Sequence, residues 1–531
     1  MVGSLLVSCG TTQEKTVVPS NPKLAALQVP EGFHAEHLFG PSENGEGSWV
    51  SMTFDDKGRL IASDQYGALY RMNIPAIGDA LTKVVATPLR VPSTEKRKDT
   101  TSNRINMGYA HGLLYAFNSL YVVVNHHGDK DFPTTSGLYR LQDTDGDDEF
   151  DKITLLKELE GSGEHGPHSI VLSPDKKSLY LIAGNFTAIP SMNRYRVQPE
   201  AQLDNLLPMI RDPRGHDNNV AWHGGWIAHL DSTGTDWELY ASGFRNPFDL
   251  AFNDAGDMFT YDSDMEWDMG TPWYRPTRIC HVTSGADFGW RPGTGKWHPG
   301  FADSRPAILN IGQGSPTNLV YGANARFPEK YRRALFAFDW SFGIIYAIHL
   351  EPDGSGYRAT GEEFISGSPL PLTDGVIGPD GALYFLTGGR RLESDLYRVY
   401  YKDGNLPIEP LQPAEPNEAN KIRRQLEAHH ANPGAEAIEQ AWPYLNHEDD
   451  GIRFAAVKTL EQAPLSAWKT RLLNEADNIT RVSAMVALSK KAKQVSSSEW
   501  QSLLEKTDYQ SLGVKHQLAL VRALEVWLSR T

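Results

Sequence analysis

From residue 27 onward the sequence repeats one pattern of apolar and polar positions: a short apolar strand, a turn built on Asp or Gly, and a second strand that often ends in Leu-Tyr. Turn residues of this kind tolerate the positive φ that tight hairpin turns require, so each copy predicts a β-hairpin. The copies are residues 52–72, 115–125, 170–185, 250–264, 335–350 and 375–389.

Six spaced hairpins, each too small to bury its own face, predict a mainly β fold, a six-bladed β-propeller that hides its sheet edges by radial repetition. A β-sandwich would also contain hairpins and is the alternative. The uneven spacing predicts long insertions at residues 91–106, 186–226 and 261–306, which we expect to build a lid or rim over one face.

After residue 402 the pattern changes, because four prolines within residues 402–418 can neither continue a strand nor start a long helix. Three later segments carry apolar residues at helical spacing and resemble one another, which favours stacked helical pairs of the HEAT type; an irregular bundle is the alternative. Because no polar capping repeat follows the last helix, we expect the natural protein to continue beyond Thr531. The predicted organisation is a leader and tether (1–26), a propeller (27–402), a linker (403–418) and HEAT-like repeats (419–531).

The composition excludes several classes of protein. The 531 residues carry a formal charge of -15, so the chain lacks the basic field of nucleic-acid binders, and we expect no nucleic-acid partner. Its two cysteines exclude a disulfide framework, a cysteine-rich zinc site and the attachment motif of a c-type haem.

Cys9 follows Leu6, Val7 and Ser8, as in bacterial lipoprotein processing sites, and a polar spacer follows it. This arrangement predicts a mature chain that starts at Cys9 and is anchored by lipid at the membrane, in the periplasm or on the cell surface. A free thiol near a ragged chain start is the alternative. No later window reaches the 18 or more apolar residues of a membrane-spanning helix.

Residues 243–290 concentrate charge and aromatic side chains to a degree that a structural segment rarely needs. Alternating carboxylates offer oxygen ligands to a hard cation such as calcium. Aromatic faces stack on sugar rings or a planar cofactor, and arginines bind carboxylates, which favours an anionic ligand or a carbohydrate. The carboxylates are Asp262, Asp264, Glu266 and Asp268, and their neighbours include Trp273, Arg275 and Arg278.

A second acidic run, residues 143–151, also alternates carboxylates around a glycine and partly follows an EF-hand loop. The glycine comes early and no Glu occupies the twelfth position, so a calcium site here would have another geometry. A solvated acidic turn is the alternative. The candidate ligands are Asp143, Asp145, Asp147, Glu149 and Asp151.

Histidines cluster between residues 111 and 298. His165 lies just before a predicted strand, where propeller loops converge, and could act as a general base near neutral pH. A turn histidine bonded to backbone is the alternative, as is a metal pair of His165 with His168. His111 belongs to the same cluster and is a candidate cofactor contact.

The sequence resembles the glucose/sorbosone dehydrogenase family over roughly residues 29–401. The motif GFRNPFDLAF, which starts at Gly243, looks like that family's G-x-R-N-P-x-x-L-x-F, and the DFGW that ends at Trp290 resembles the close of the same block. The chain looks closer still to the family's membrane-bound branch, in which HEAT-like repeats and often a c-type haem domain follow the propeller. The haem domain is missing from this sequence.

The resemblance implies a six-bladed propeller that carries pyrroloquinoline quinone and calcium. It places His165 at the catalytic base, Arg245 and Asn246 at the cofactor-contacting pair, and residues 264–270 at the calcium loop. Asn185 aligns with the carboxylate that orients the base. The positions that should grip the quinone through cations align near Ser341, Pro371 and Thr373, all neutral; Arg275, Arg278, Arg390 or Arg391 would have to substitute.

The leading interpretation is a quinone-dependent sugar or alcohol dehydrogenase of the cell envelope. His165 takes the hydroxyl proton, Arg245 stabilises charge on the acceptor, and electrons leave to a separate carrier such as a cytochrome c. The first rival is a calcium-dependent carbohydrate-binding propeller or a metal-assisted lyase or hydrolase without a redox cofactor. The second rival is an interaction scaffold that acts through its helical repeats.

Overall fold

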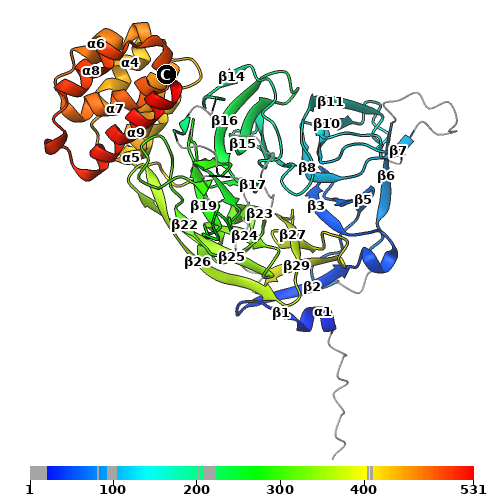
Figure 1. Cartoon of the computed structure of the whole chain (residues 1–531). Coiled ribbons are helices and arrows are strands. Elements are labelled where there is room, and N and C mark those ends of the chain that lie inside the picture. The colour runs from blue at the N-terminus through cyan, green and yellow to red at the C-terminus, as the bar shows by residue number, and fades with distance from the viewer. Residues whose placement is uncertain are drawn as a thin grey trace, which may run out of the picture.

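The computed structural model describes residues 21–79, 83–92, 104–130, 132–200, 204–206, 210, 223–268, 270–293, 295–402, 406 and 411–531. Within these residues, six sheets of four or five strands surround one axis, and a group of helices lies at one side of the ring (Figure 1). The predicted six-bladed propeller followed by C-terminal helices is thus confirmed. The HEAT-type arrangement of those helices stays a prediction.

Each blade starts with an inner strand beside the axis. The first contains β3 (Trp49–Phe54), β4 (Leu60–Asp64), β5 (Leu69–Met72), β6 (Thr87–Pro92) and β7 (Arg104–Asn106). The second contains β8 (Ala110–Ala116), β9 (Ser119–Val124), β10 (Gly137–Gln142) and β11 (Lys152–Glu158). The third contains β12 (Pro167–Leu172), β13 (Ser178–Ala183), β15 (Gly225–Asp231), β16 (Trp237–Phe244) and β14 (Arg194–Tyr195).

The other three blades complete the ring. The fourth contains β17 (Pro247–Phe252), β18 (Met258–Asp262), β19 (Arg278–Val282) and β22 (Leu309–Asn310). The fifth contains β23 (Pro316–Tyr321), β24 (Ala334–Asp339), β25 (Ile344–Asp353), β26 (Gly356–Gly367) and β1 (Leu27–Gln28). The sixth contains β27 (Leu372–Ile377), β28 (Leu383–Thr387), β29 (Asp395–Tyr401) and β2 (Phe33–Phe39). A separate ribbon pairs β20 (Trp290–Arg291) with β21 (Gly295–Lys296).

The inner strands contact one another in the cyclic order β3, β8, β12, β17, β23 and β27, so they enclose a central channel. Five of the six predicted hairpins include an inner strand. The hairpin at residues 335–350 instead forms β24 and β25, the second and third strands of its blade. All six residues of β24 are buried, whereas β23 mixes buried and partly exposed positions and therefore gives a weaker apolar signal.

The ring is closed by the N-terminal part of the chain, because β2 pairs antiparallel with β29 in the last blade. A buried ion pair between Glu36 of β2 and Arg398 of β29 reinforces the pairing. Apolar side chains between adjacent blades form the core, for example the cluster of Trp49, Met52, Leu60, Tyr384 and Leu396 between the first and sixth blades. The start of the inner strands is thereby held by a rigid ring.

Two short helices, α1 (Pro22–Ala25) and α2 (Glu329–Arg332), belong to the propeller region. The C-terminal helices share one apolar cluster that includes Trp442, Leu460, Met485 and Trp500. They are α3 (Glu418–Glu427), α4 (Ala435–Ala441), α5 (Asp450–Gln462), α6 (Lys469–Leu473), α7 (Asn478–Ser489), α8 (Ser497–Lys506) and α9 (Val514–Arg530).

Buried ion pairs join these helices to the propeller. Asp303, in the loop before β22, accepts hydrogen bonds from Arg522 Nε at 2.8 Å and from Lys490 Nζ at 2.9 Å. Asp204 accepts from Lys490 Nζ at 2.6 Å and from Arg530 Nε at 2.8 Å. The cations of Arg522 and Lys490 hold the pKa of Asp303 well below its usual range, although burial alone would raise it. The helical part therefore docks through charges that water does not reach.

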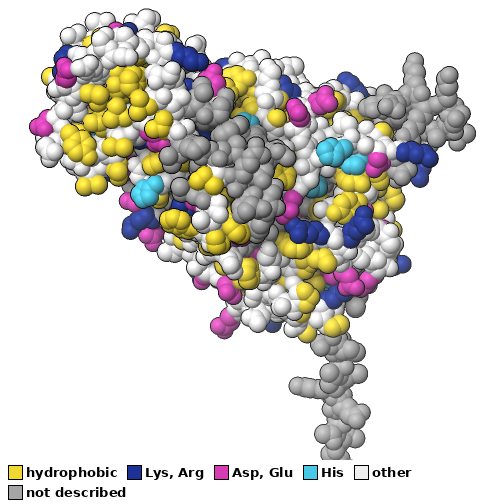
Figure 2. All heavy atoms as spheres, viewed as in Figure 1, with side chains coloured by type: hydrophobic (Ala, Val, Ile, Leu, Met, Phe, Trp, Pro, Cys, Tyr) yellow, Lys and Arg dark blue, Asp and Glu magenta, His cyan; other side chains and the backbone are white. Residues whose placement is uncertain are grey.

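The outer surface mixes charges of both signs, and apolar side chains gather over the helical part (Figure 2). On α9 the side chains of Val514, Leu518, Val521 and Leu528 are exposed. No helix among the described residues is both long enough and apolar enough to cross a bilayer.

Replacing Asp303 should destabilise the protein strongly. Asp303→Asn leaves the buried cations of Arg522 and Lys490 short of a partner, so we expect a loss of about 3–5 kcal/mol in the free energy of unfolding. Because the pKa of Asp303 is depressed in the folded state, its stabilisation is present above the ordinary carboxyl pKa and is lost as the pH falls below it.

Urea unfolding followed by circular dichroism measures this effect. The matched control is Asp353→Asn, whose carboxylate forms only an exposed 3.6 Å pair with Arg358 and should change stability by about 0–1 kcal/mol. Equal unfolding midpoints for the two variants would contradict the role given to Asp303.

Candidate functional site

Polar side chains gather at one end of the channel, where the inner strands begin. Two adjoining hollows of about 570 and 430 Å³ lie there and share the lining residues Glu164, Asn246, Ser315 and Pro316. Loops and strand ends from all six blades contribute to their walls. We call the two hollows together the face cavity. A site built from all six blades requires the closed ring.

His165 lines the face cavity just before β12 and is 2% exposed. Its Nδ1 lies 2.6 Å from Oδ1 of Asn185, which is buried after β13. Because an amide oxygen only accepts, Nδ1 is the donor, and in the neutral ring the lone pair then lies on Nε2. The backbone N–H of Asn185 in turn donates to the carbonyl of Arg245 at 3.0 Å. This tautomer is the one that a general base requires.

Arg245 and Asn246 form the turn between β16 and β17, and both are buried in the cavity wall. Their backbone N–H groups each donate to Oδ1 of Asp262 at 3.0 Å. The other oxygen of Asp262 accepts from Arg278 Nε at 3.0 Å and Nη2 at 2.9 Å. Asp262 therefore holds the turn, and Arg278 holds Asp262.

The Arg245 guanidinium reaches the cavity. Its Nη1 donates to the Ser263 hydroxyl at 3.3 Å, and its Nη2 lies 4.0 Å from a carboxylate oxygen of Glu266. Close packing behind the turn leaves room only for glycine at position 184, where a Cβ would lie 2.3 Å from Asn246 Oδ1 and 2.6 Å from the His165 carbonyl. His165 and the turn are thus held against one another.

Two further histidines lie beside this layer. His168 Nε2 donates to Asn246 Oδ1 at 2.7 Å, and its ring stacks on Phe248. His111 Nδ1 accepts from Asn125 Nδ2 at 3.1 Å. Burial lowers the pKa of His111 to about 4 and that of His168 to about 3, so both rings are neutral at pH 7. His111 lines the cavity as an uncharged polar wall, while His168 positions Asn246.

The four alternating carboxylates of the 262–268 loop fall into two groups: two pair with arginines, and two line the cavity. Asp262 is engaged as described, and Asp268 accepts from Arg275 Nε at 2.8 Å. Asp264 and Glu266 line the face cavity, so the insertion at residues 261–306 does contribute to its rim. A calcium site at this loop stays a prediction, with Asp264 and Glu266 as the ligands that face the cavity.

Three predicted cofactor contacts lie apart from the described lining. Trp273 is 57% exposed, with the Arg275 guanidinium 5.1 Å from its ring centroid. Arg278 pairs with Asp262 and lies over the Phe288 ring. These side chains support the loop, and none of them is among the described residues that line the face cavity.

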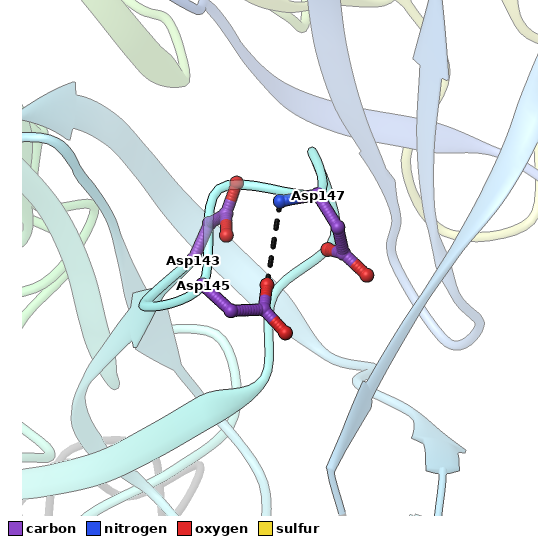
Figure 3. A group of neighbouring side chains, drawn as sticks. All are labelled: Asp143, Asp145 and Asp147. Atoms are coloured by element: carbon purple, nitrogen blue, oxygen red, sulfur yellow. Dashed lines mark hydrogen bonds between the residues drawn. The ribbon is translucent and has the colours of Figure 1, made fainter.

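The acidic run at residues 143–151 folds into a turn between β10 and β11 of the second blade. Asp143, Asp145 and Asp147 bring carboxylate oxygens within 4.8 Å of one another and are the one such acidic group among the described residues (Figure 3). Asp151 instead accepts hydrogen bonds from Thr144, and Glu149 lies outside the group. The guanidinium of Arg59 holds the pKa of neighbouring Asp148 below its usual range.

Sequence reasoning missed the aromatic wall of the cavity. Tyr66, Tyr109 and Trp340 line it, and Tyr109 stacks on His126 with ring centroids 3.6 Å apart. Arg390 also lines it, lies over Trp340, and pairs with Glu164 at 2.5 Å. The three aromatic residues come from three blades and share no motif; their common signal is a position just before or after an inner hairpin. Arg390 is one of the cations that the family resemblance offered as a substitute.

Neither the family models nor the curated proteins contain a match to this sequence. Several solved structures resemble the chain at low sequence identity. A protein described as an oxidoreductase (glucose dehydrogenase) from Thermus thermophilus is 18% identical, with a TM-score of 0.47 over 69% of this chain and 99% of that one.

Two aldose sugar dehydrogenases show a similar likeness. The Streptomyces coelicolor protein in its PQQ-bound form is 14% identical, with a TM-score of 0.44 over 70% of this chain and 100% of that one. The soluble Escherichia coli protein in its apo form is 15% identical, with a TM-score of 0.46 over 70% and 99%. Likeness at this level leaves the activity to be inferred from the chain's own residues.

Removing the carboxylate of Asp262 should loosen the Arg245–Asn246 turn. In Asp262→Ala two buried N–H groups lose their acceptor and Arg278 loses its counter-charge, so we expect the free energy of unfolding to fall by at least about 3 kcal/mol. Hydrogen exchange at the amides of Arg245 and Asn246 should also accelerate.

Hydrogen–deuterium exchange with mass spectrometry on the peptide that contains the turn reports the second effect. Glu266→Ala removes an exposed carboxylate from the same loop and should leave both quantities near wild type. Unchanged exchange in Asp262→Ala would show that the turn is held by other contacts.

Proposed function

We propose that the face cavity binds a sugar or a related alcohol and that the protein is a dehydrogenase acting on its hydroxyl-bearing carbon. The observation that supports this most directly is the pairing of His165 with Asn185 beside the Arg245–Asn246 turn. It places an imidazole, whose neutral form has its lone pair on Nε2, next to a guanidinium in the wall of a cavity that also has aromatic sides.

In the proposed reaction His165 Nε2 accepts the hydroxyl proton while hydride leaves the same carbon for a two-electron acceptor. Asn185 is a positioning residue, because its amide oxygen fixes the imidazole tautomer but supplies no charge to stabilise an imidazolium. Arg245 stabilises negative charge that develops on the substrate or acceptor oxygen. The aromatic wall supplies faces on which a sugar ring can stack.

Pyrroloquinoline quinone does not fit the described lining well. Its three carboxylates need cations, whereas the arginines among the described lining residues are Arg245 and Arg390, each beside a glutamate. Ser341 and Thr373 line the cavity as neutral groups where the family resemblance leads us to expect cations. We therefore assign no step to this quinone, and we favour an acceptor of lower negative charge, such as an uncharged quinone, with electrons then passing to a separate carrier.

The same neutral positions favour a second candidate. A carbohydrate-binding propeller, or a metal-assisted lyase or hydrolase, would use His165 and the aromatic wall without a redox partner. Asp264 and Glu266, which line the cavity beside Arg245, could hold a calcium ion for such a function. We also propose calcium at the group formed by Asp143, Asp145 and Asp147.

Dye reduction across a panel of sugars and alcohols separates the candidates, with one arm supplied with pyrroloquinoline quinone and calcium and one arm without. Oxidation in either arm supports the dehydrogenase, and the arm in which it occurs identifies the acceptor class. His165→Ala should lower the rate about 10²–10⁴-fold, because the proton acceptor is removed.

His298→Ala is the matched control for this variant, since His298 is exposed and its Nδ1 contacts only the nearby Gly300 amide. It should retain the wild-type rate. Sugar binding without dye reduction in either arm would count against oxidation and favour the second candidate.

We propose further that the chain is anchored by lipid at Cys9 and works outside the cytoplasm. Cys9 lies outside the described residues. Expressed in a Gram-negative bacterium with radiolabelled palmitate, the wild-type chain should carry label and fractionate with membranes, and Cys9→Ala should lose both properties. Ser8→Ala is the control that should keep them; label retained by Cys9→Ala would refute the anchor.

A further inference from the structure

The central channel holds a second group of polar side chains, in addition to those of the face cavity. A cavity of about 320 Å³ is lined by residues of all six inner strands. In five of these strands the third residue is polar and lines this cavity. The five are Ser51 of β3, Ser169 of β12, Asp249 of β17, Asn318 of β23 and Asp374 of β27, and we call them the channel ring.

The members of the channel ring contact one another in sequence around the axis. Asn318 Nδ2 donates to Asp249 Oδ2 at 2.9 Å and to Asp374 Oδ1 at 2.5 Å, so one amide bridges two carboxylates from neighbouring blades. Asp249 also accepts from the backbone N–H of Leu250 at 2.8 Å, and Asp374 accepts from those of Met52 at 2.6 Å and Gly375 at 2.8 Å. The side chains of Ser169 and Ser51 lie beside Asp249 and Asp374. Oxygen atoms from five blades therefore converge on one region of the channel.

The charge of this group is not balanced by protein. Neither Asp249 nor Asp374 has a cationic partner among the described residues, although Asp249 is only 9% exposed. Two adjacent carboxylates in such a place require either protons or a bound cation, because an isolated buried charge is costly.

Asn318 supplies an independent sign of a missing ligand. The residue is 3% exposed, and its Oδ1 has no hydrogen-bond partner among the described residues. A buried amide oxygen without a partner is uncommon and costs free energy. Rotating the amide by half a turn would bring Oδ1 between the two carboxylates, which is repulsive without a cation and favourable with one.

We propose that the channel ring is a binding site for a hard divalent cation, with calcium as the ion that its ligands suit best. Carboxylate, amide and hydroxyl oxygens are the donors that calcium prefers, and its coordination tolerates the irregular geometry of ligands from separate strands. The cavity also leaves room for water to complete the shell. Such an ion ties Asp249, Asn318 and Asp374 of the fourth, fifth and sixth blades together. This site does not depend on the function proposed for the face cavity.

The test measures calcium per chain by mass spectrometry of the metal after dialysis against a chelator, return to calcium chloride and removal of unbound ion. The starting protein carries Asp143→Asn, Asp145→Asn and Asp147→Asn, which removes the exposed acidic group. It also carries Asp264→Asn and Glu266→Gln, which removes the carboxylates that line the face cavity. It should retain about one calcium ion, and its melting temperature should rise on calcium addition. Adding Asp249→Asn and Asp374→Asn should abolish both the ion and the shift.

The control adds Asp353→Asn instead, which removes an exposed carboxylate outside the channel. It should leave both measurements unchanged. The proposal is overturned if the starting protein retains no calcium, or if the channel variant retains as much as it does. Should the channel variant fail to fold, anomalous diffraction from wild-type crystals grown in calcium chloride decides the matter. A peak between Asp249 and Asp374 supports the site, and its absence refutes it.

Discussion

The carboxylate of Asp262 is the contact on which the geometry of the face cavity depends. It takes the backbone N–H groups of Arg245 and Asn246 on one oxygen and the guanidinium of Arg278 on the other. From that turn, the Arg245 carbonyl fixes Asn185, which fixes the tautomer of His165. Asp262, at the end of β18, is thus linked through the turn and Asn185 to Nδ1 of a histidine in the preceding blade.

The closed ring makes this arrangement possible. Because β2 completes the last blade, the inner strands are held at fixed positions, and the residues at their starts converge on one axis. The same convergence produces two polar layers, the face cavity at the strand starts and the channel ring at the third position of five inner strands. The helices add no residue to the described lining of the face cavity; they dock on the propeller through Asp303 and Asp204.

Much of this fold follows from local patterns in the sequence. Repeated hairpins predicted the blades, and the G-x-R-N-P motif predicted that Arg245 and Asn246 would lie at a site together with His165. The sequence could not show that Asp262 is a structural counter-charge, because its partner Arg278 lies on the adjacent strand, beyond the loop that contains the other carboxylates. The channel ring was missed because each strand contributes a single polar residue, and Asp249 and Asp374 are brought together only by closure. One visible signal was the repeated third-position residue in PFDLAF, PTNLVY and LTDGVI.

The claim that the face cavity is the ligand site, with His165 at the reacting hydroxyl, is tested most directly by a crystal structure with a bound sugar. We predict density for the sugar in the face cavity, against the aromatic wall, with one hydroxyl within hydrogen-bond reach of His165 Nε2 and another oxygen near Arg245. A sugar bound elsewhere on the molecule, with the face cavity holding only water, would contradict the account.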